Sequence, residues 1–343
     1  MVCVTNYISS YHEPLFPGGI AMQTCAAVVS SFDHPPRYEA FDFPAPADPD
    51  QAVVDVLATG LHPRVRSGAS GRHYSSTGRL PMVPGIDGVG RTTEGRVVYF
   101  VADDDLPGSM AEQTVVDTRR TVPLPDGTDV VQVAAAMNPA MSAWVALRRR
   151  VPIRPGQSVL VLGATGNAGR MAIQVARLLG AGRVVGAGRN AEVLAGLGAD
   201  ATVALTDDAG ATAAALAEQA AEVDLVLDYL WGAPAAAAMV PLLRARSDRS
   251  RALDWIQIGS VAGPTIELPS VVLRSANLRI QGNGQGAVST RAYVEELPAL
   301  VEEIGSGRIA IATRTERLAD VERVWTEPDE PGVRTVLTPD VRS

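Results

Sequence analysis

The sequence predicts an α/β protein in which a doubly wound parallel sheet is inserted into a mostly β domain. Three observations predict this fold. Short apolar runs alternate with helical patterns from residue 158 to residue 282. Strand-like runs separated by Pro, Gly and Asp come before them. A glycine-rich turn in VLGATGNAGR joins the first apolar run of the alternating part to its first helix.

The first part of the chain has the pattern of an antiparallel sheet. AAVVSSF and AVVDVLATG alternate with Pro and Asp, and MVPGIDGVGRTTEGRVVYF adds two further strands with glycines between them. Helical periodicity begins near Asp129 in DVVQVAAAMNPAMSAWVALRRR. Pro139 predicts that this segment divides into two helices.

From residue 158 the pattern changes to alternating strands and helices. SVLVLG is a continuous apolar run, which is typical of a strand buried on both faces. NAGRMAIQVARLLG follows with apolar residues at helical spacing and ends at Gly180. Further strands are expected at RVVGAG, ATVAL, DLVLDYL, ALDWIQIGS and NLRIQGNG, with helices between them. The alternation predicts stacked βαβ units.

The last fifty or so residues do not follow this alternation. From Tyr293, one amphipathic helix precedes strand-like pieces that end in GVRTVLTP. We therefore predict that residues 22–140 and 291–343 form one domain and that residues 141–290 form the inserted α/β domain.

Composition and charge exclude several classes of protein. The chain has 343 residues and a formal net charge of -8, which argues against a nucleic-acid partner. VAAAMNPAMSAWVAL is interrupted by Asn138, Pro139 and Ser142, so no run reaches the roughly 18 apolar residues of a membrane span. No basic segment followed by an apolar core opens the chain. We expect a cytoplasmic protein with no membrane partner.

Cysteine and histidine usage predicts no bound metal. The spacing of these residues matches neither a disulfide framework nor a common zinc site. The cysteines and histidines of the chain are Cys3, Cys25, His12, His34, His62 and His73.

The glycine-rich turn has the features of a phosphate-binding turn. Gly166 allows the backbone to approach a pyrophosphate, and Gly169 allows the helix to pack close to the strand. Backbone N–H groups and the dipole of the following helix favour an anion. The alternative is a βα turn without a ligand. The predicted pyrophosphate-binding residues are Ala164, Thr165, Gly166, Asn167, Ala168 and Gly169.

The end of the second strand in this part, RVVGAGRN, predicts which dinucleotide binds. An NAD enzyme of this fold has an Asp or Glu about twenty residues beyond the glycines. Gly188 and Arg189 stand there instead, and Asn190 follows. A guanidinium matches the 2′-phosphate of NADPH, so we predict NADPH as cofactor, bound by these three residues. The alternative is a solvated arginine at a helix start.

These motifs resemble the zinc-free quinone oxidoreductases of the medium-chain dehydrogenase/reductase superfamily. GQSVLVLGATGNAGRMAIQVARLLGA is similar to their A-x-G-x-x-G cofactor segment. LPMVPGIDGVGR and QIGSVAGPTIELPSVVLRSANLRIQGNG extend the resemblance, which runs from Met22 to Pro339 and leaves residues 1–21 as an extension. It implies a Rossmann domain inserted into a GroES-like catalytic domain, and a homodimer.

The resemblance also implies a zinc-independent reaction. Zinc alcohol dehydrogenases of this superfamily have a cysteine where this chain has His62, and a His-Glu pair where it has Ile86 and Asp87. Their four-cysteine lobe is replaced by ADDDLPGSM. Without a Lewis acid, hydride transfer is easiest to a conjugated carbonyl or quinone.

The resemblance further implies a nicotinamide site in the cleft between the domains. Its residues would be Ser142, Gly259, Ser260 and Asn283; for the glycines in these segments, turn formation is the alternative.

Tyr74 and His62 are the candidate catalytic residues, with Arg64 and Arg66 as weaker candidates. Tyr74 could donate a proton or hydrogen bond to a carbonyl oxygen; the alternative is a surface tyrosine. Asp87 is expected to accept hydrogen bonds from loop backbone N–H groups.

Asp228 is expected to end its strand. The sequence as a whole predicts an NADPH-dependent reductase of a small molecule with an activated double bond, such as a quinone or an enone. Two alternatives stay open: a reductase of an unsaturated biosynthetic intermediate, and an NADPH-binding redox sensor without turnover.

Overall fold

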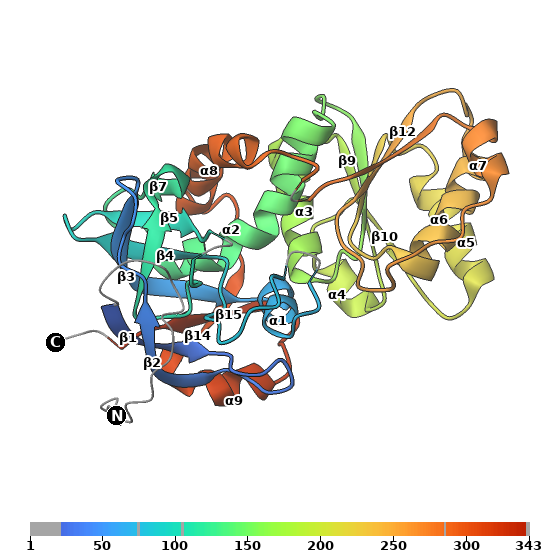
Figure 1. The fold of residues 1–343 in the computed structure, drawn as a ribbon. Coiled ribbons are helices and arrows are strands. Elements are labelled where there is room, and N and C mark those ends of the chain that lie inside the picture. The colour runs from blue at the N-terminus through green and yellow to red at the C-terminus, as the bar shows by residue number, and fades with distance from the viewer. Residues whose placement is uncertain (1–21, 74–75, 104–105, 285, 341–343) are drawn as a thin grey trace. The chain divides into compact units, whose positions relative to one another are not determined.

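The computed structural model describes residues 22–73, 76–103, 106–284 and 286–340. The chain forms two compact units, which Figure 1 shows as ribbons. Unit 1 consists of Met1–Ala135 and Ala312–Ser343, and unit 2 of Ala136–Ile311.

Unit 2 is built around a six-stranded parallel sheet in the order β10-β9-β8-β11-β12-β13. From β8 the chain proceeds outward to β10, then returns to β11 beside β8 and proceeds outward on the other side, so the strand order reverses between β8 and β11. The sequence prediction of a doubly wound sheet is confirmed. The strands are β8 (Ser158–Leu162), β9 (Arg183–Gly188), β10 (Ala201–Ala204), β11 (Leu225–Asp228), β12 (Leu253–Gln257) and β13 (Leu278–Gly282).

Helices connect these strands and bury their apolar side chains. Leu160, Val185 and Trp255 are completely buried in the core of this unit. Because helices cover a parallel sheet on both faces, its central strands are apolar throughout. The helices are α3 (Asn167–Leu178), α4 (Ala191–Ala195), α5 (Ala209–Ala220), α6 (Gly232–Ala245) and α7 (Ser270–Ser275), with α8 (Thr290–Gly305) after the last strand.

Asp228 ends β11, as expected from the sequence. Its carboxylate accepts hydrogen bonds from the backbone N–H groups of Leu230 (2.8 Å) and Trp231 (2.9 Å) and from Trp255 Nε1 (2.9 Å). These bonds hold the turn in which Trp231 adopts a φ of 50°, a conformation that is rare for a residue other than glycine. Burial raises the pKa of the Asp228 carboxyl.

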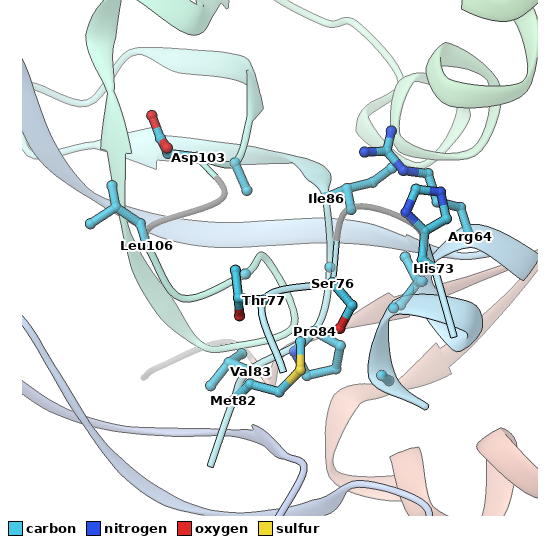
Figure 2. Close-up of a pocket in the computed structure, with 16 residues that line it drawn as sticks. Arg64, His73, Ser76, Thr77, Met82, Val83, Pro84, Ile86, Asp103 and Leu106 are labelled. Atoms are coloured by element: carbon cyan, nitrogen blue, oxygen red, sulfur yellow. The ribbon is translucent and has the colours of Figure 1, made fainter. Parts of the chain in front are cut away.

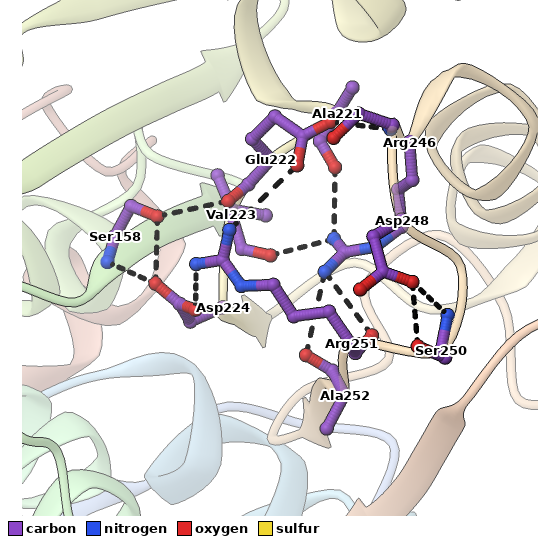
Figure 3. Close-up of polar contacts among 11 residues, drawn as sticks. Ser158, Ala221, Glu222, Val223, Asp224, Arg246, Asp248, Ser250, Arg251 and Ala252 are labelled. Carbon is purple, nitrogen blue, oxygen red and sulfur yellow. Dashed lines mark hydrogen bonds and ion pairs between the residues drawn. The ribbon is translucent and has the colours of Figure 1, made fainter.

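Arginine side chains form hydrogen bonds and ion pairs at the amino-terminal edge of the same sheet, as Figure 3 shows. Arg246 donates to the carbonyl oxygens of Ala221 (2.9 Å) and Val223 (2.8 Å). Arg251 pairs with Asp224, which lies just before β11. The polar groups drawn there contact one another, so we assign this edge a structural role.

Unit 1 is mostly β, as predicted. A seven-stranded sheet has the order β14-β15-β3-β4-β5-β7, with β6 paired to β3, and β1 pairs with β2 in a second sheet. Pairing is antiparallel except between β14 and β15. The strands are β1 (Met22–Val28), β2 (Arg37–Phe43), β3 (Gln51–Leu61), β4 (Asp87–Thr92), β5 (Val97–Val101), β6 (Gln113–Asp117), β7 (Thr121–Pro123), β14 (Ala312–Arg317) and β15 (Val333–Thr338). The described part of this unit also contains the α-helices α1 (Pro63–Ala69) and α9 (Val321–Thr326).

The unit boundaries differ from the predicted domain boundaries after residues 140 and 290. The units divide after Ala135 and after Ile311, so α8 belongs to unit 2. The reason is a buried contact. Glu296 of α8 is 3% exposed and accepts hydrogen bonds from Trp144 Nε1 (2.9 Å) and Arg148 Nε (2.5 Å).

Pro139 lies inside one helix, α2 (Val130–Val145), and does not separate two helices as predicted. Asp129 begins this helix by accepting from Val131 N and Gln132 N, each at 3.0 Å. Most residues around Pro139 are buried, and this burial outweighs the missing N–H group. The segment Val130–Arg150 is long and apolar enough to cross a membrane, but 67% of its apolar window is buried inside the protein, which is typical of a core helix.

Candidate functional site

The glycine-rich turn joins β8 to α3 at the carboxyl edge of the parallel sheet. Gly163 adopts a φ of 88°, which favours glycine. The N–H groups of Gly163 and Ala164 both donate to Ala187 O at 2.9 Å, which fixes the turn against β9. The Ala164 methyl group is completely buried, so alanine fits where the usual pattern has its first glycine.

Gly166 and Gly169 are glycines for different reasons. A Cβ at Gly169 would lie 2.2 Å from Gly163 O and 2.7 Å from Ala164 Cα, so packing excludes any side chain. A Cβ at Gly166 would meet only Gly163 O, at 3.5 Å. Protein packing therefore leaves space at Gly166, as a phosphate-binding turn requires.

The amino terminus of α3 is suited to an anion. Gly166 is the N-cap residue, no side chain caps the helix, and no acidic residue lies in its first turn. By position, the N–H groups of Ala168 and Gly169 have no partner within the helix. These groups and the helix dipole attract a phosphate. Thr165 and Asn167 flank Gly166 in the same turn.

Gly188, Arg189 and Asn190 lie next to this turn. A Cβ at Gly188 would lie 2.8 Å from Thr165 Cγ2, which places the end of β9 against the glycine-rich turn. Arg189 is exposed and has no hydrogen bond or ion pair within the described ranges. Asn190 Oδ1 accepts from Val193 N (3.0 Å) and caps α4, so its side chain also has a structural role.

A second group of polar side chains surrounds Ser142. Ser142 Oγ lies 2.9 Å from Pro139 O and 3.0 Å from Tyr229 Oη, and Asn283 Nδ2 donates to Ser142 O at 2.8 Å. The structure thus brings together two predicted nicotinamide residues that are far apart in the sequence. A Cβ at Gly163 would lie 3.2 Å from Tyr229 Cβ, so this group adjoins the glycine-rich turn.

Sequence reasoning missed Tyr229. It directly follows Asp228, which was expected to end its strand, and ligands of open α/β sheets bind outside the carboxyl ends of the strands; this position was the available signal.

Gly259 and Ser260 follow β12 at the same edge. Gly259 N donates to Asp228 O (3.1 Å), and a Cβ at Gly259 would lie 2.7 Å from Tyr229 O. Packing alone therefore requires this glycine. Ser260 is exposed.

In unit 1, His62 lies in a buried polar cluster. It is 2% exposed, and its Nε2 lies 3.7 Å from Asp87 Oδ1. Burial lowers the pKa of His62, which favours the neutral ring. Asp87 Oδ2 accepts from Tyr99 Oη (2.8 Å), and burial raises the pKa of Tyr99. The predicted bonds from loop N–H groups to the Asp87 carboxylate are not found within the described residues: Tyr99 on β5 donates to Oδ2, and Oδ1 has no hydrogen-bond partner there.

Tyr74 and Arg66 are two further residues of unit 1 that the sequence suggested as candidates. Tyr74 lies outside the described residues. Arg66 donates to Trp325 O and pairs with Asp329 at 3.3 Å, which gives it a structural role.

Arg64 lines a pocket beside α1, drawn in Figure 2. The pocket has a volume of about 110 Å³, and its lining includes the apolar side chains of Met82, Val83 and Ile86. Arg64 and His73 lie on one side of it and Asp103 on another. Ligand pockets usually have volumes of roughly 300–1,000 Å³, so this small pocket by itself does not identify a small-molecule site.

Known proteins resemble this chain in sequence and in fold. No protein-family model matches the chain. It is 32% identical to the probable NADPH-dependent quinone reductase tdiC of Emericella nidulans over 92% of this chain and 99% of that one. It is 27% identical to the trans-enoyl reductase pgmF of Aspergillus terreus over 45% and 49% of the two chains. A mycobacterial protein solved in complex with NADPH shares the fold, with a TM-score of 0.75 and 21% identity over 92% of this chain and 100% of that one.

Proposed function

Because the chain belongs to the quinone oxidoreductase-like members of the medium-chain dehydrogenase/reductase superfamily, we propose that it is an NADPH-dependent, zinc-independent reductase of a quinone, an enone or another activated double bond. One observation carries the choice of cofactor. Arg189, which is exposed and has no partner among the described residues, stands beside a turn whose Gly166 leaves space for phosphates. Support for the substrate class comes from the named activity of the 32% identical relative.

Different residues of unit 2 would bind different parts of this cofactor. The N–H groups at the start of α3 would hold the pyrophosphate, and the Arg189 guanidinium would hold the 2′-phosphate. When bound, NADPH supplies a hydride to the electrophilic carbon of the substrate, and the carbonyl or quinone oxygen then takes up a proton.

Steady-state oxidation of NADPH with a panel of quinones, enones and unsaturated thioesters tests the proposal. We expect turnover with at least one quinone or enone. Turnover with thioesters alone would favour the reductase of a biosynthetic intermediate, an alternative supported by the similarity to a trans-enoyl reductase. Binding of NADPH without oxidation by any compound would favour the redox sensor.

The purified protein is expected to contain no stoichiometric zinc and to keep its activity in chelators. Within the described ranges, no three His, Cys, Asp or Glu side chains converge as metal ligands. Elemental analysis checks this expectation. One tightly held metal ion per chain would contradict it.

A homodimer is the expected assembly. β13 is an edge strand of the parallel sheet, and the segment before it carries the exposed apolar side chains of Val261, Val271 and Leu273. An unpaired edge strand favours association with another chain. Light scattering at micromolar concentration should give twice the chain mass of 35.9 kDa, and a monomer mass would overturn this prediction.

Tyr74→Phe is expected to lower kcat while leaving NADPH affinity unchanged, because the hydroxyl is proposed to act on the substrate. Initial-rate kinetics together with NADPH titration make the measurement. Unchanged kinetics would indicate that Tyr74 is a surface tyrosine without a catalytic role.

A cytoplasmic location without nucleic-acid or membrane partners is proposed as well; the net charge of -8 argues against a nucleic-acid partner.

A further inference from the structure

Tyr229, Ser142 and Asn283 form a hydrogen-bonded group at the carboxyl edge of the parallel sheet. Tyr229 follows β11 directly, where the strand order reverses between β8 and β11. Ligands of open α/β sheets bind at such a reversal. The neighbouring Gly163 places the group against the glycine-rich turn.

The partners of Ser142 determine the direction of each hydroxyl hydrogen bond. Pro139 O, 2.9 Å from Ser142 Oγ, can only accept, so the single Ser142 hydroxyl hydrogen points to it. The bond of 3.0 Å between Ser142 Oγ and Tyr229 Oη must therefore use the Tyr229 hydrogen. Toward a ligand, Tyr229 Oη then acts as an acceptor.

Asn283 provides a second acceptor. Its Nδ2 donates to Ser142 O at 2.8 Å, and because a carbonyl oxygen can only accept, this bond fixes the orientation of the amide. Asn283 is 7% exposed, and its Oδ1 has no hydrogen-bond partner within the described residues. A buried acceptor without a partner is rare in protein interiors and indicates a missing donor.

We propose that Tyr229 and Asn283 position the cofactor by accepting hydrogen bonds from the carboxamide NH₂ of the nicotinamide, and that Ser142 holds the Tyr229 hydroxyl in its accepting orientation. This inference rests on the proposed NADPH-dependent function. The carboxamide nitrogen carries two hydrogens, which match two acceptors. Burial raises the pKa of the Tyr229 hydroxyl, which keeps its proton on the bond to Ser142.

Calorimetric titration with NADP⁺ and with its 3-acetylpyridine analogue tests the proposal without relying on activity. In the analogue a methyl group replaces the NH₂ group. The wild-type protein should bind the analogue about tenfold more weakly, because the bonds to the amide hydrogens are lost. In Tyr229→Phe the ratio should fall to about threefold, since one acceptor is gone. Tyr293→Phe on α8, outside this group, should keep the wild-type ratio.

Asn283→Ala provides an independent second variant and should reduce the ratio in the same way. Equal binding of the two nucleotides to the wild-type protein would overturn the inference alone. A wild-type ratio in folded Tyr229→Phe and Asn283→Ala would also overturn it. If the folded wild-type protein binds neither nucleotide, the proposed function fails, and this inference fails with it.

Discussion

Gly169→Ala is expected to destabilise unit 2 severely, whereas Gly166→Ala should fold normally and lose cofactor affinity. The methyl group added in Gly169→Ala would overlap the backbone of Gly163 and Ala164, with its nearest contact at 2.2 Å, and backbone atoms cannot turn away as a flexible side chain can. Overpacking commonly costs about 1–3 kcal/mol, and this rigid contact places the variant at or above the upper end of that range.

The same methyl group at Gly166 would meet no protein atom closer than 3.5 Å, and the φ of -76° there suits alanine. It would instead intrude on the proposed pyrophosphate, with an expected loss of about tenfold in NADPH affinity, or roughly 1.4 kcal/mol.

Urea unfolding and NADPH titration separate these two effects. Gly305→Ala is the matched control, because a Cβ there meets nothing within 4 Å; it should leave NADPH affinity unchanged and should not lower stability, since alanine is favoured over glycine in a helix. Wild-type stability of Gly169→Ala would show that the turn can relax. Wild-type affinity of Gly166→Ala would show that the phosphates bind elsewhere.

The sequence predicts the sheet of unit 2 well because its signals are local. Each strand is a short apolar run, and Asp228 and the glycine-rich turn mark strand ends within a few residues. Local signals could not predict that α8 belongs to unit 2 and not to unit 1. It depends on Glu296 meeting Trp144 and Arg148, which lie about 150 positions earlier and carry no shared pattern.

In the candidate site, too, contiguous motifs could be predicted from the sequence, whereas partners far apart in the sequence could not. The glycine-rich turn and Arg189 each lie in a contiguous motif, so the sequence alone singles them out as candidates. The Tyr229–Ser142 bond joins residues 87 positions apart, and Asp87 meets Tyr99 across paired strands. Such partners follow from the tertiary fold, not from spacing. Pro139 was mispredicted because burial of α2 outweighs local propensity.

Arg189→Ala is expected to remove most of the preference for NADPH over NADH. The wild-type protein should prefer NADPH by at least about tenfold, since a charged hydrogen bond contributes roughly 1.5–3 kcal/mol. Arg189 is exposed and directly follows β9, whose last residue, Gly188, lies against Thr165 of the turn, and no described carboxylate pairs with the guanidinium. Its charge is therefore available to a 2′-phosphate, and no acidic side chain at this strand end favours a 2′-hydroxyl instead.

The control for this change is Arg274→Ala, which removes an equal charge from an exposed position on α7. If the preference arises from the local guanidinium, Arg189→Ala should weaken NADPH binding and leave NADH binding nearly unchanged, while Arg274→Ala should leave both unchanged. Dissociation constants for both nucleotides at one fixed ionic strength make this comparison, because salt screens exposed charges. Equal affinity of the wild-type protein for NADPH and NADH would overturn the assignment and leave Arg189 as a solvated residue at a helix start.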